Sequence, residues 1–160
     1  MKTLCLYYSR TNLTKEIMKK IAAMTDARLL EYTDGVYRQG VSGYIRSCFD
    51  AFRKPPEVFF FGNEPEWEEY DKVIVAMPVW AEQPCVIGKA LLMQYSGKFR
   101  GDVYLVVTHM ANNDYDKAIR KIYPYCAKEP VAHLSLQTKT HDPTAEIEQF
   151  VRDHGLSKAE

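Results

Sequence analysis

Short apolar runs alternate with segments of helical periodicity along most of the chain. A run of roughly four to eight apolar residues rich in β-branched and aromatic side chains predicts a buried strand, whereas apolar residues recurring about every three to four positions predict a helix. By these criteria we expect strands at Thr3–Tyr8, Ala27–Tyr32, Val73–Met77, Val103–Thr108 and Val131–Gln137. We expect helices at Asn12–Met24, Val86–Gln94, Asn113–Tyr123 and Thr144–Asp153.

This alternation of strands and helices predicts an α/β fold. Helices that connect successive strands produce a parallel sheet, which they cover on both faces. The runs Val73–Met77 and Val103–Thr108 are apolar almost throughout, as burial on both faces requires. A chain of 160 residues is long enough for one hydrophobic core. We therefore predict a single domain that covers residues 1–160.

One segment, from Thr33 to Asp71, interrupts the alternation. It contains a plausible helix from Tyr44 to Arg53, followed by the run Val58–Phe61, which we interpret as an extra edge strand or a hydrophobic lid. The aromatic residues of this segment are expected to pack on the sheet rather than to form the wall of a substrate site.

Charge and composition argue against several classes of protein. Lysines plus arginines number 21, as do aspartates plus glutamates, so the chain lacks the basic excess typical of nucleic-acid-binding proteins. The balance also argues against a strongly acidic electron carrier that steers by charge. The chain starts without a signal-peptide pattern, and no apolar run approaches the ~20 residues of a membrane helix. We expect a cytoplasmic protein without nucleic-acid or membrane partners.

The cysteines also indicate a cytoplasmic protein. Cys5, Cys48, Cys85 and Cys126 are far apart and form no C-x-x-C pair. This pattern predicts reduced thiols, as in cytoplasmic proteins, and it lacks the closely spaced ligands of a zinc site. A redox role for Cys85 is not favoured, because it has no partner thiol.

The loop after the first strand has the chemistry of a phosphate site. Residues 9–14 read Ser-Arg-Thr-Asn-Leu-Thr and lead directly into a helix. In a parallel α/β sheet, ligands bind beyond the carboxyl ends of the strands. Free N–H groups and the positive end of a helix dipole favour an anion there, and hydroxyl groups add donors. A helix cap would need only one such residue. Walker and Rossmann motifs are absent.

Two segments resemble the flavodoxin family. Tyr8–Thr14 is similar to the phosphate-binding signature [ST]-x-T-G-x-T, and Asp71–Trp80 resembles the third strand of flavodoxins with the flavin loop that follows. The likeness covers most of residues 1–110. It implies a doubly wound, five-stranded parallel sheet in the order 2-1-3-4-5, an insertion between strands two and three, and flavin mononucleotide (FMN) as cofactor. Asn12 replaces the usual glycine, and asparagine tolerates a left-handed backbone better than most residues.

The resemblance implies that three loops hold the cofactor. The first loop would contact the phosphate, and Trp80 in the second would stack on the flavin ring or flank it. The predicted cofactor-binding residues are Ser9, Arg10, Thr11, Asn12, Leu13, Thr14, Pro78, Val79, Trp80, Ala81, Thr108, His109, Met110 and Asn113. We predict no catalytic residue, because FMN supplies the electron chemistry. His109 is expected to be hydrogen-bonded or solvated, and His133 to be structural.

Three functions are compatible with these features. The first is a flavodoxin-like redox protein that passes electrons through FMN to a partner protein or a small acceptor. The second is an NAD(P)H-dependent FMN or quinone reductase. The aromatic insertion and the zero net charge favour this second function to some extent. The third is an interaction module without cofactor, a hypothesis that rests on Asn12. The run Phe59–Phe61 is a candidate contact of a homodimer.

Overall fold

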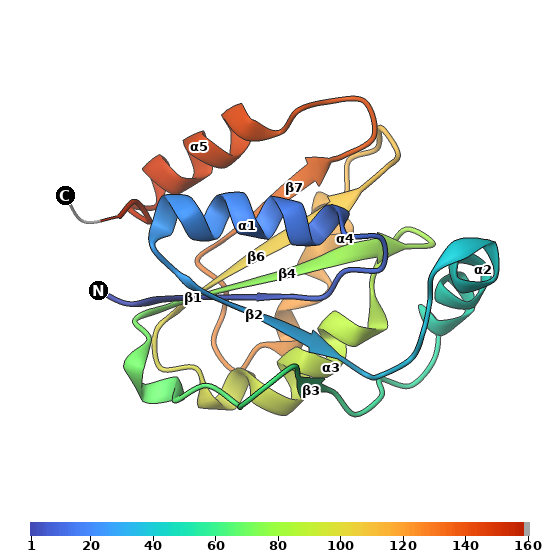
Figure 1. The fold of residues 1–160 in the computed structure, drawn as a ribbon, viewed down its shortest axis with the longest axis horizontal. Coiled ribbons are helices and arrows are strands. Elements are labelled where there is room, and N and C mark those ends of the chain that lie inside the picture. The colour runs from blue at the N-terminus through green and yellow to red at the C-terminus, as the bar shows by residue number, and fades with distance from the viewer. Residues whose placement is uncertain (159–160) are drawn as a thin grey trace.

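The computed structural model describes residues 1–158, which form a central sheet with helices on both faces (Figure 1). Five strands are parallel: β1 (Thr3–Tyr7), β2 (Arg28–Thr33), β4 (Lys72–Trp80), β6 (Asp102–His109) and β7 (Ala132–Gln137). They lie in the order β2-β1-β4-β6-β7, which is the predicted order 2-1-3-4-5. The predicted count of five strands is too low, because two short antiparallel strands join them. These are β3 (Phe59–Phe60), which pairs with β2, and β5 (Gln83–Pro84), which pairs with β4.

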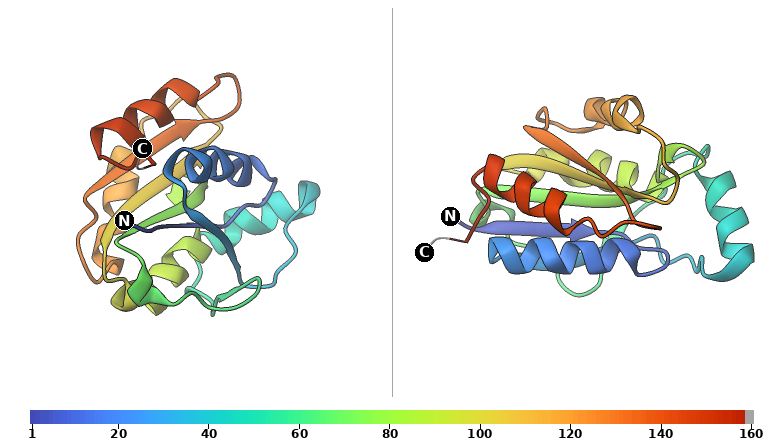
Figure 2. Two further views of the ribbon diagram at one scale, coloured as in Figure 1. Left: turned by 60° about the vertical axis from the view of Figure 1, so that its left-hand side comes forward. Right: turned by 90° about the horizontal axis from the view of Figure 1, so that it is seen from above.

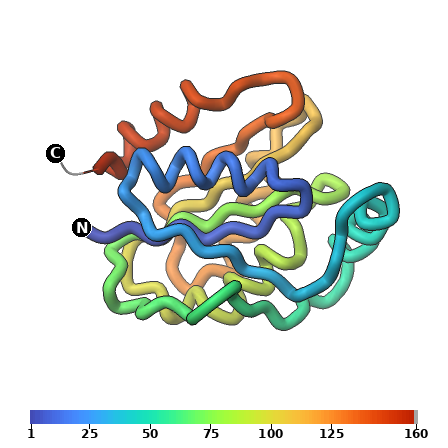
Figure 3. Tube along the Cα trace, viewed as in Figure 1, coloured from blue at the N-terminus to red at the C-terminus, as the bar shows by residue number. Residues whose placement is uncertain are grey.

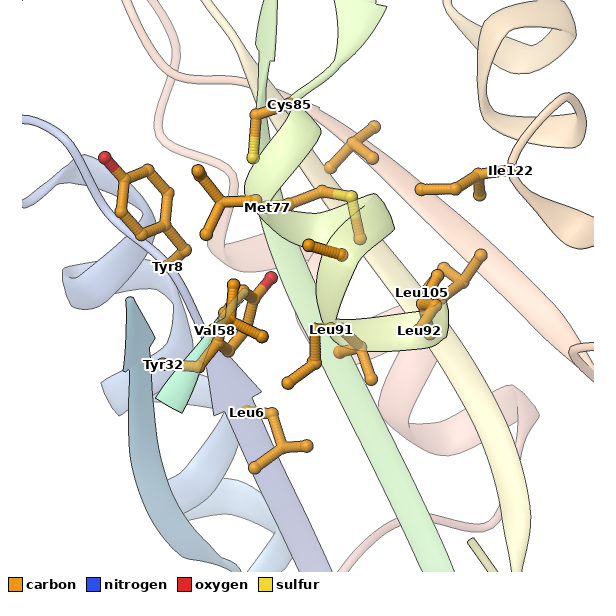
Figure 4. Close-up of a cluster of buried hydrophobic side chains, with 14 of the residues drawn as sticks. Leu6, Tyr8, Tyr32, Val58, Met77, Cys85, Leu91, Leu92, Leu105 and Ile122 are labelled. Carbon is orange, nitrogen blue, oxygen red and sulfur yellow. The ribbon is translucent and has the colours of Figure 1, made fainter. Parts of the chain in front are cut away.

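Alternating side chains of the strands fill two separate cores. On one face, residues such as Ile74 and Val106 pack with α1 (Leu13–Thr25) and α5 (Thr144–Asp153). On the other face, residues such as Met77 and Leu105 pack with α3 (Val86–Tyr95), as Figure 4 shows. Gly88 allows this close approach, because a Cβ there would lie 2.2 Å from the sulfur of Met77.

The predicted helix Asn113–Tyr123 is wrong in extent. Helix α4 covers only Asp116–Arg120, and a 3₁₀ turn follows at Tyr123–Tyr125. Before the helix, the Asp114 carboxylate accepts a hydrogen bond from the Asp116 N–H (2.8 Å), which forms a turn in place of a helical start. After it, Pro124 disfavours a helical backbone at the residue that precedes it.

Part of the inserted segment packs as predicted. Phe60, Trp67 and Tyr70 are buried in the core that contains α3, and the Trp67 ring lies 5.2 Å from that of Phe99. Phe59 and Phe61, in contrast, are exposed. Of the two interpretations of this run, the edge strand is confirmed, because β3 pairs with the outer side of β2.

Helix α2 (Gly40–Asp50) stands at one end of the molecule, away from the helices that cover the sheet (Figures 1 and 2). Figure 3 shows that the chain runs along β1 from its start toward this end. The carboxyl end of β1 therefore lies near α2. No helix among residues 1–158 has the length and apolar character needed to cross a membrane.

Candidate functional site

A cavity of about 410 Å³ lies beyond the carboxyl ends of β1, β4 and β6. All three predicted loops line it. The predicted residues that the structure brings together there are Arg10, Thr11, Leu13, Thr14, Pro78, Val79, Trp80, Ala81, Thr108, His109 and Met110. Among the described residues, Ser9, Asn12 and Asn113 are not part of the lining. Asn113 lies in a separate depression beside Glu82 and Lys117.

The start of α1 is open toward an anion. Asn12 is the N-cap residue and has the expected left-handed backbone (φ 66°), but its side chain accepts no capping hydrogen bond within residues 1–158. The hydroxyl Oγ of Ser9 is buried without a hydrogen-bond partner in the same part of the chain. Buried polar atoms nearly always have a partner. The first turn of α1 and Ser9 therefore offer donors that no group of residues 1–158 uses.

Two buried threonines connect the first and third loops. The hydroxyls of Thr14 and Thr108 lie 2.7 Å apart and form a hydrogen bond in which either can donate. Whichever hydroxyl accepts keeps its own hydrogen free to donate to a third atom. This pair fixes the start of α1 against the end of β6.

The second loop is a tight hairpin with a left-handed backbone. Ala81 (φ 47°) and Glu82 (φ 59°) form its two central residues, between Trp80 and Gln83. Two successive residues with positive φ define a type I′ turn, in which glycine or asparagine is usual. Alanine and glutamate at these positions cost energy, and strain of this kind concentrates at functional sites.

Trp80 is held from behind the cavity. Its ring lies edge to face with that of Tyr8, with the centroids 5.7 Å apart, and its Nε1–H is buried without an acceptor in the described residues. Only 5% of Trp80 is exposed, so most of the indole surface is already covered. Its predicted contact with a flavin stays a prediction, and this burial favours flanking over full stacking.

A buried ion cluster supports Trp80 and α2. The Arg38 guanidinium donates to both carboxylate oxygens of Asp34 (2.6 and 2.7 Å) and through Nε to Asp50 in α2 (3.1 Å). It also lies over the Trp80 ring, 5.3 Å from the centroid, and donates to the Tyr8 hydroxyl (3.4 Å). Burial by itself would lower the pKa of Arg38, but the hydrogen bonds to Asp34 and the neighbouring charges raise it above its ordinary value. The Arg38 guanidinium therefore stays charged.

His109 is hydrogen-bonded, as predicted. Its Nδ1 lies 2.8 Å from the Ala111 carbonyl oxygen and its Nε2 lies 2.9 Å from Ser135 Oγ, so both ring nitrogens have partners. His133 contacts the Tyr123 hydroxyl and Asp116 outside the cavity lining, and its structural role stays a prediction.

Several lining residues were not predicted as cofactor contacts. Helix α2 contributes a wall of the cavity, and other residues come from the hairpin and from the chain after β6 and β7. They are Tyr44, Ser47, Cys48, Glu82, Ala111, Tyr115, Thr138 and Lys139. The rule that ligands bind beyond strand ends would have identified Thr138, which directly follows β7. The sequence predicts a helix at Tyr44–Arg53, close to α2 (Gly40–Asp50). Its periodicity does not indicate where an inserted helix lies relative to the strand ends, so the sequence did not place α2 at the cavity.

All four cysteines are free, and two of them, Cys5 and Cys85, are fully buried. Burial raises the pKa of the Cys85 thiol to about 12, and its sulfur accepts a hydrogen bond from the Gly88 N–H (3.4 Å) at the start of α3. Burial also raises the pKa of Cys5 to about 12. Cys48, in contrast, is half-buried and lines the cavity.

We expect Cys85 to resist thiol reagents in the native protein. At pH 8 a pKa of about 12 leaves a thiolate fraction roughly a thousandfold below that of an ordinary thiol. Labelling with Ellman's reagent, followed by peptide mapping, should find Cys85 modified only after unfolding, whereas Cys48 should react in the native state. Rapid native labelling of Cys85 would contradict its burial and reopen the question of a redox role.

The fold matches that of known flavoproteins. No protein-family model matches the chain, and no curated protein matches its sequence. Among solved structures, a flavoprotein from Lactobacillus acidophilus in complex with FMN is 24% identical and superposes with a TM-score of 0.72 over 92% of this chain and 97% of that one. A flavodoxin from the domain Archaea is 10% identical, with a TM-score of 0.57 over 98% and 99% of the two chains. An NADH:FMN oxidoreductase in its apo form is 12% identical, with a TM-score of 0.52 over 100% and 92%. The chain therefore has the flavodoxin-like fold.

Proposed function

We propose that this protein binds FMN in the cavity and acts as a flavodoxin-like redox protein. The observation that carries the proposal is the uncapped start of α1, which lies next to the buried, unpartnered hydroxyl of Ser9. A phosphate monoester would accept hydrogen bonds from these donors and would interact favourably with the helix dipole. Thr11, exposed at the cavity wall, adds a further hydroxyl.

The rest of the cavity suits a flat, largely apolar ring. Pro78, Val79 and Trp80 form one wall, and Met110 and Tyr115 contribute from the third loop and the segment after it. When bound, FMN supplies the electron chemistry itself. The residues of this chain would orient the ring, exclude water from it and hold the phosphate.

The fold alone does not distinguish a carrier from a reductase, because it is shared by a flavodoxin and an NADH:FMN oxidoreductase. The balanced charge of the chain favours an NAD(P)H-dependent FMN or quinone reductase as the second candidate. Turnover separates the two: a reductase oxidises NAD(P)H in the presence of a quinone, and a carrier does not. In either case the proposed acceptor is a redox partner protein or a small molecule, and the proposed compartment is the cytoplasm.

Titration of the apo-protein with FMN, riboflavin and FAD tests cofactor binding directly. Flavin fluorescence and the protection of Cys48 against alkylation give two independent readouts, because Cys48 lines the cavity. We expect FMN to bind at least roughly tenfold more tightly than riboflavin, since only FMN presents a terminal phosphate to the start of α1. Equal, weak binding of the three flavins would contradict the proposal and favour a module without cofactor.

A further inference from the structure

Helix α2 turns its small and polar side toward the protein. Its buried residues are Gly43, Ser47 and Asp50, at the spacing of one helical face. A Cβ at Gly43 would lie 2.0 Å from the Arg38 carbonyl carbon, so the helix packs directly on the backbone there. The Arg38 guanidinium lies 3.0 Å from the Asp50 carboxylate at the end of the same face. The helix is therefore attached to the protein through backbone packing and ionic contacts rather than through an apolar face.

The opposite side of α2 carries large apolar side chains in solvent. Val41, Ile45 and Phe49 follow one another at intervals of four residues, and Phe52 lies three residues further, in the turn after the helix. Their exposed fractions are 78%, 51%, 69% and 75%. We call these four residues the outer face. A surface helix normally buries its apolar stripe, whereas α2 exposes it, and exposed apolar patches of this kind mark interaction sites.

The outer face lies at an extremity of the molecule. Figures 1 and 2 show α2 at one end, away from the helices that cover the sheet. Because the buried residues of α2 point toward the sheet, the outer face points away from it. A flat surface could therefore contact the outer face without meeting the sheet or the helices that cover it.

The exposed charges around the outer face are cationic. Between residues 34 and 56 the chain has two acidic residues, Asp34 and Asp50, and their side chains are 4% and 6% exposed. The exposed charged residues of this segment are Arg46, Arg53 and Lys54. Arg46 and Arg53 lie 3.5 and 3.6 Å from Asp50, but that carboxylate already pairs with the buried Arg38. The whole chain has a net charge of zero, so this segment concentrates exposed positive charge at one end of the molecule.

We propose that the outer face of α2 is a peripheral membrane-binding surface that contacts anionic lipids. A helix with phenylalanine and other apolar side chains on one face and arginine or lysine beside them lies in the interface of a bilayer. Its apolar face enters the boundary between headgroups and acyl chains, and its cations remain at the headgroups. The anionic lipids of the cytoplasmic leaflet attract such cations. The outer face and the exposed cations beside it provide both features.

The size and the charge of the outer face favour a lipid surface over a protein. If each of its four side chains contributes on the order of 100 Å², the face offers roughly 400 Å², about half of the ~800 Å² per partner of a standard protein interface. A second copy would also bring like charges together. A bilayer needs no complementary shape, and its binding strength adds electrostatic attraction to the apolar area that is buried.

A contact of this kind needs no helix that spans the bilayer. The expectation of a protein without membrane partners rested on the lack of an apolar run long enough to span one, and a peripheral helix contains no such run. Tyr44 and Cys48 of α2 line the cavity, so membrane contact would place the cavity beside the lipid surface. If the cavity binds FMN as proposed, electron acceptors dissolved in the bilayer would come within its reach.

Cosedimentation with vesicles tests the proposal. The anionic vesicles contain equal parts of phosphatidylglycerol and phosphatidylcholine, and the control vesicles contain phosphatidylcholine alone. We expect the parent to bind the anionic vesicles at low ionic strength, to bind the control vesicles at least roughly tenfold more weakly, and to dissociate as salt is added. Phe49→Glu should weaken binding to anionic vesicles at least ~tenfold. Phe61→Glu is its matched control, because Phe61 is also an exposed phenylalanine but lies beside β3, and it should bind as the parent does. Val41→Glu serves as a second test variant if Phe49→Glu fails to fold.

Two further variants measure the cationic contribution and the insertion itself. A cation near an anionic surface contributes about fivefold to binding, so Arg53→Gln/Lys54→Gln should weaken it by roughly 25-fold. Lys19→Gln/Lys20→Gln removes the same charge from the exposed side of α1 and should change binding little. In Phe49→Trp, the new indole should shift its emission to shorter wavelength on anionic vesicles and be quenched by brominated acyl chains.

Failure of the parent to bind anionic vesicles at low ionic strength would overturn the proposal, as would equal losses of binding in Phe49→Glu and Phe61→Glu. Two measurements on such an unbound parent would then identify another occupant. A dimer in sedimentation velocity that Phe49→Glu abolishes would assign the outer face to a second copy. A complex with poly-glutamate, used as an acidic probe, would assign it to an acidic protein. All measurements are made on the apo-protein and with FMN added, so their outcome is independent of whether the proposed cofactor binds.

Discussion

Replacing Arg38 by methionine should lower the free energy of unfolding by about 3–5 kcal/mol, as measured by urea denaturation at pH 7. The Arg38 side chain is 3% exposed, and the substitution leaves the carboxylates of Asp34 and Asp50, which are 4% and 6% exposed, without their common cation. A buried charge without a partner keeps its full desolvation cost, which applies chiefly to Asp34, because Asp50 keeps the exposed Arg46 and Arg53 at 3.5 and 3.6 Å. A loss of about 3–5 kcal/mol is a large fraction of the stability of a typical domain.

Arg46 provides the matched control for this experiment. Arg46 lies 3.5 Å from the same Asp50 carboxylate, but its side chain is 53% exposed. Arg46→Met should therefore cost less than about 1 kcal/mol. The triple variant Arg38→Met/Asp34→Asn/Asp50→Asn should recover most of the lost stability, because it removes the uncompensated charges together with their partner. If Arg38→Met and Arg46→Met proved equally mild, the ion cluster would not be the attachment of α2.

Thr11→Val should weaken FMN binding by roughly tenfold to a hundredfold and leave riboflavin binding unchanged. A hydrogen bond to a charged group contributes about 1.5–3 kcal/mol, and the phosphate of FMN is mostly dianionic at neutral pH. Valine keeps the volume and the β-branching of threonine, so the substitution removes little except the hydroxyl. Isothermal titration of both flavins into each apo-protein measures the difference.

Two neighbouring variants show whether the effect is specific to the phosphate. Thr14→Val removes the partner of the buried Thr108 hydroxyl and should cost about 1–3 kcal/mol of stability even without flavin. Arg10→Ala should weaken FMN binding less than Thr11→Val does, because Arg10 is engaged with the Tyr44 ring (5.6 Å) and the Arg38 carbonyl oxygen (3.4 Å). Its effect should depend on salt, which screens the interaction between the guanidinium and the phosphate. Unchanged FMN binding in Thr11→Val would place the phosphate away from this loop.

The β4–β5 hairpin shows where local sequence rules fail. The residues at its turn, Ala81 and Glu82, are not the glycine or asparagine that predict a type I′ turn, so β5 was missed. The chain pairs Val79 with Pro84 because the end of β4 and the start of α3 fix the ends of the turn. A tertiary constraint thus holds a backbone that local propensity disfavours.

The ion cluster was missed for a different reason. Arginine is almost never fully buried unless it is paired, so Arg38 in a polar loop had no sequence signal. Its two partners lie at Asp34 and Asp50, and the separations of four and twelve positions become meaningful only when α2 folds back over the loop. The three loops predicted to bind the cofactor line the cavity. The α2 wall of the cavity depends instead on the contact between Arg38 and Asp50.

The sequence by itself determined the five parallel strands, most of the covering helices and the loop before α1, because burial on one or both faces imposes a period that local residues display. The order of those strands came from the family resemblance, and the structure agrees with it. Only the tertiary structure decided that Trp80 is backed by Arg38, that Thr14 pairs with Thr108, and that α2 turns its apolar side outward. Each of these depends on residues distant in sequence, or on which side of an element meets the rest of the chain, and no local pattern encodes either.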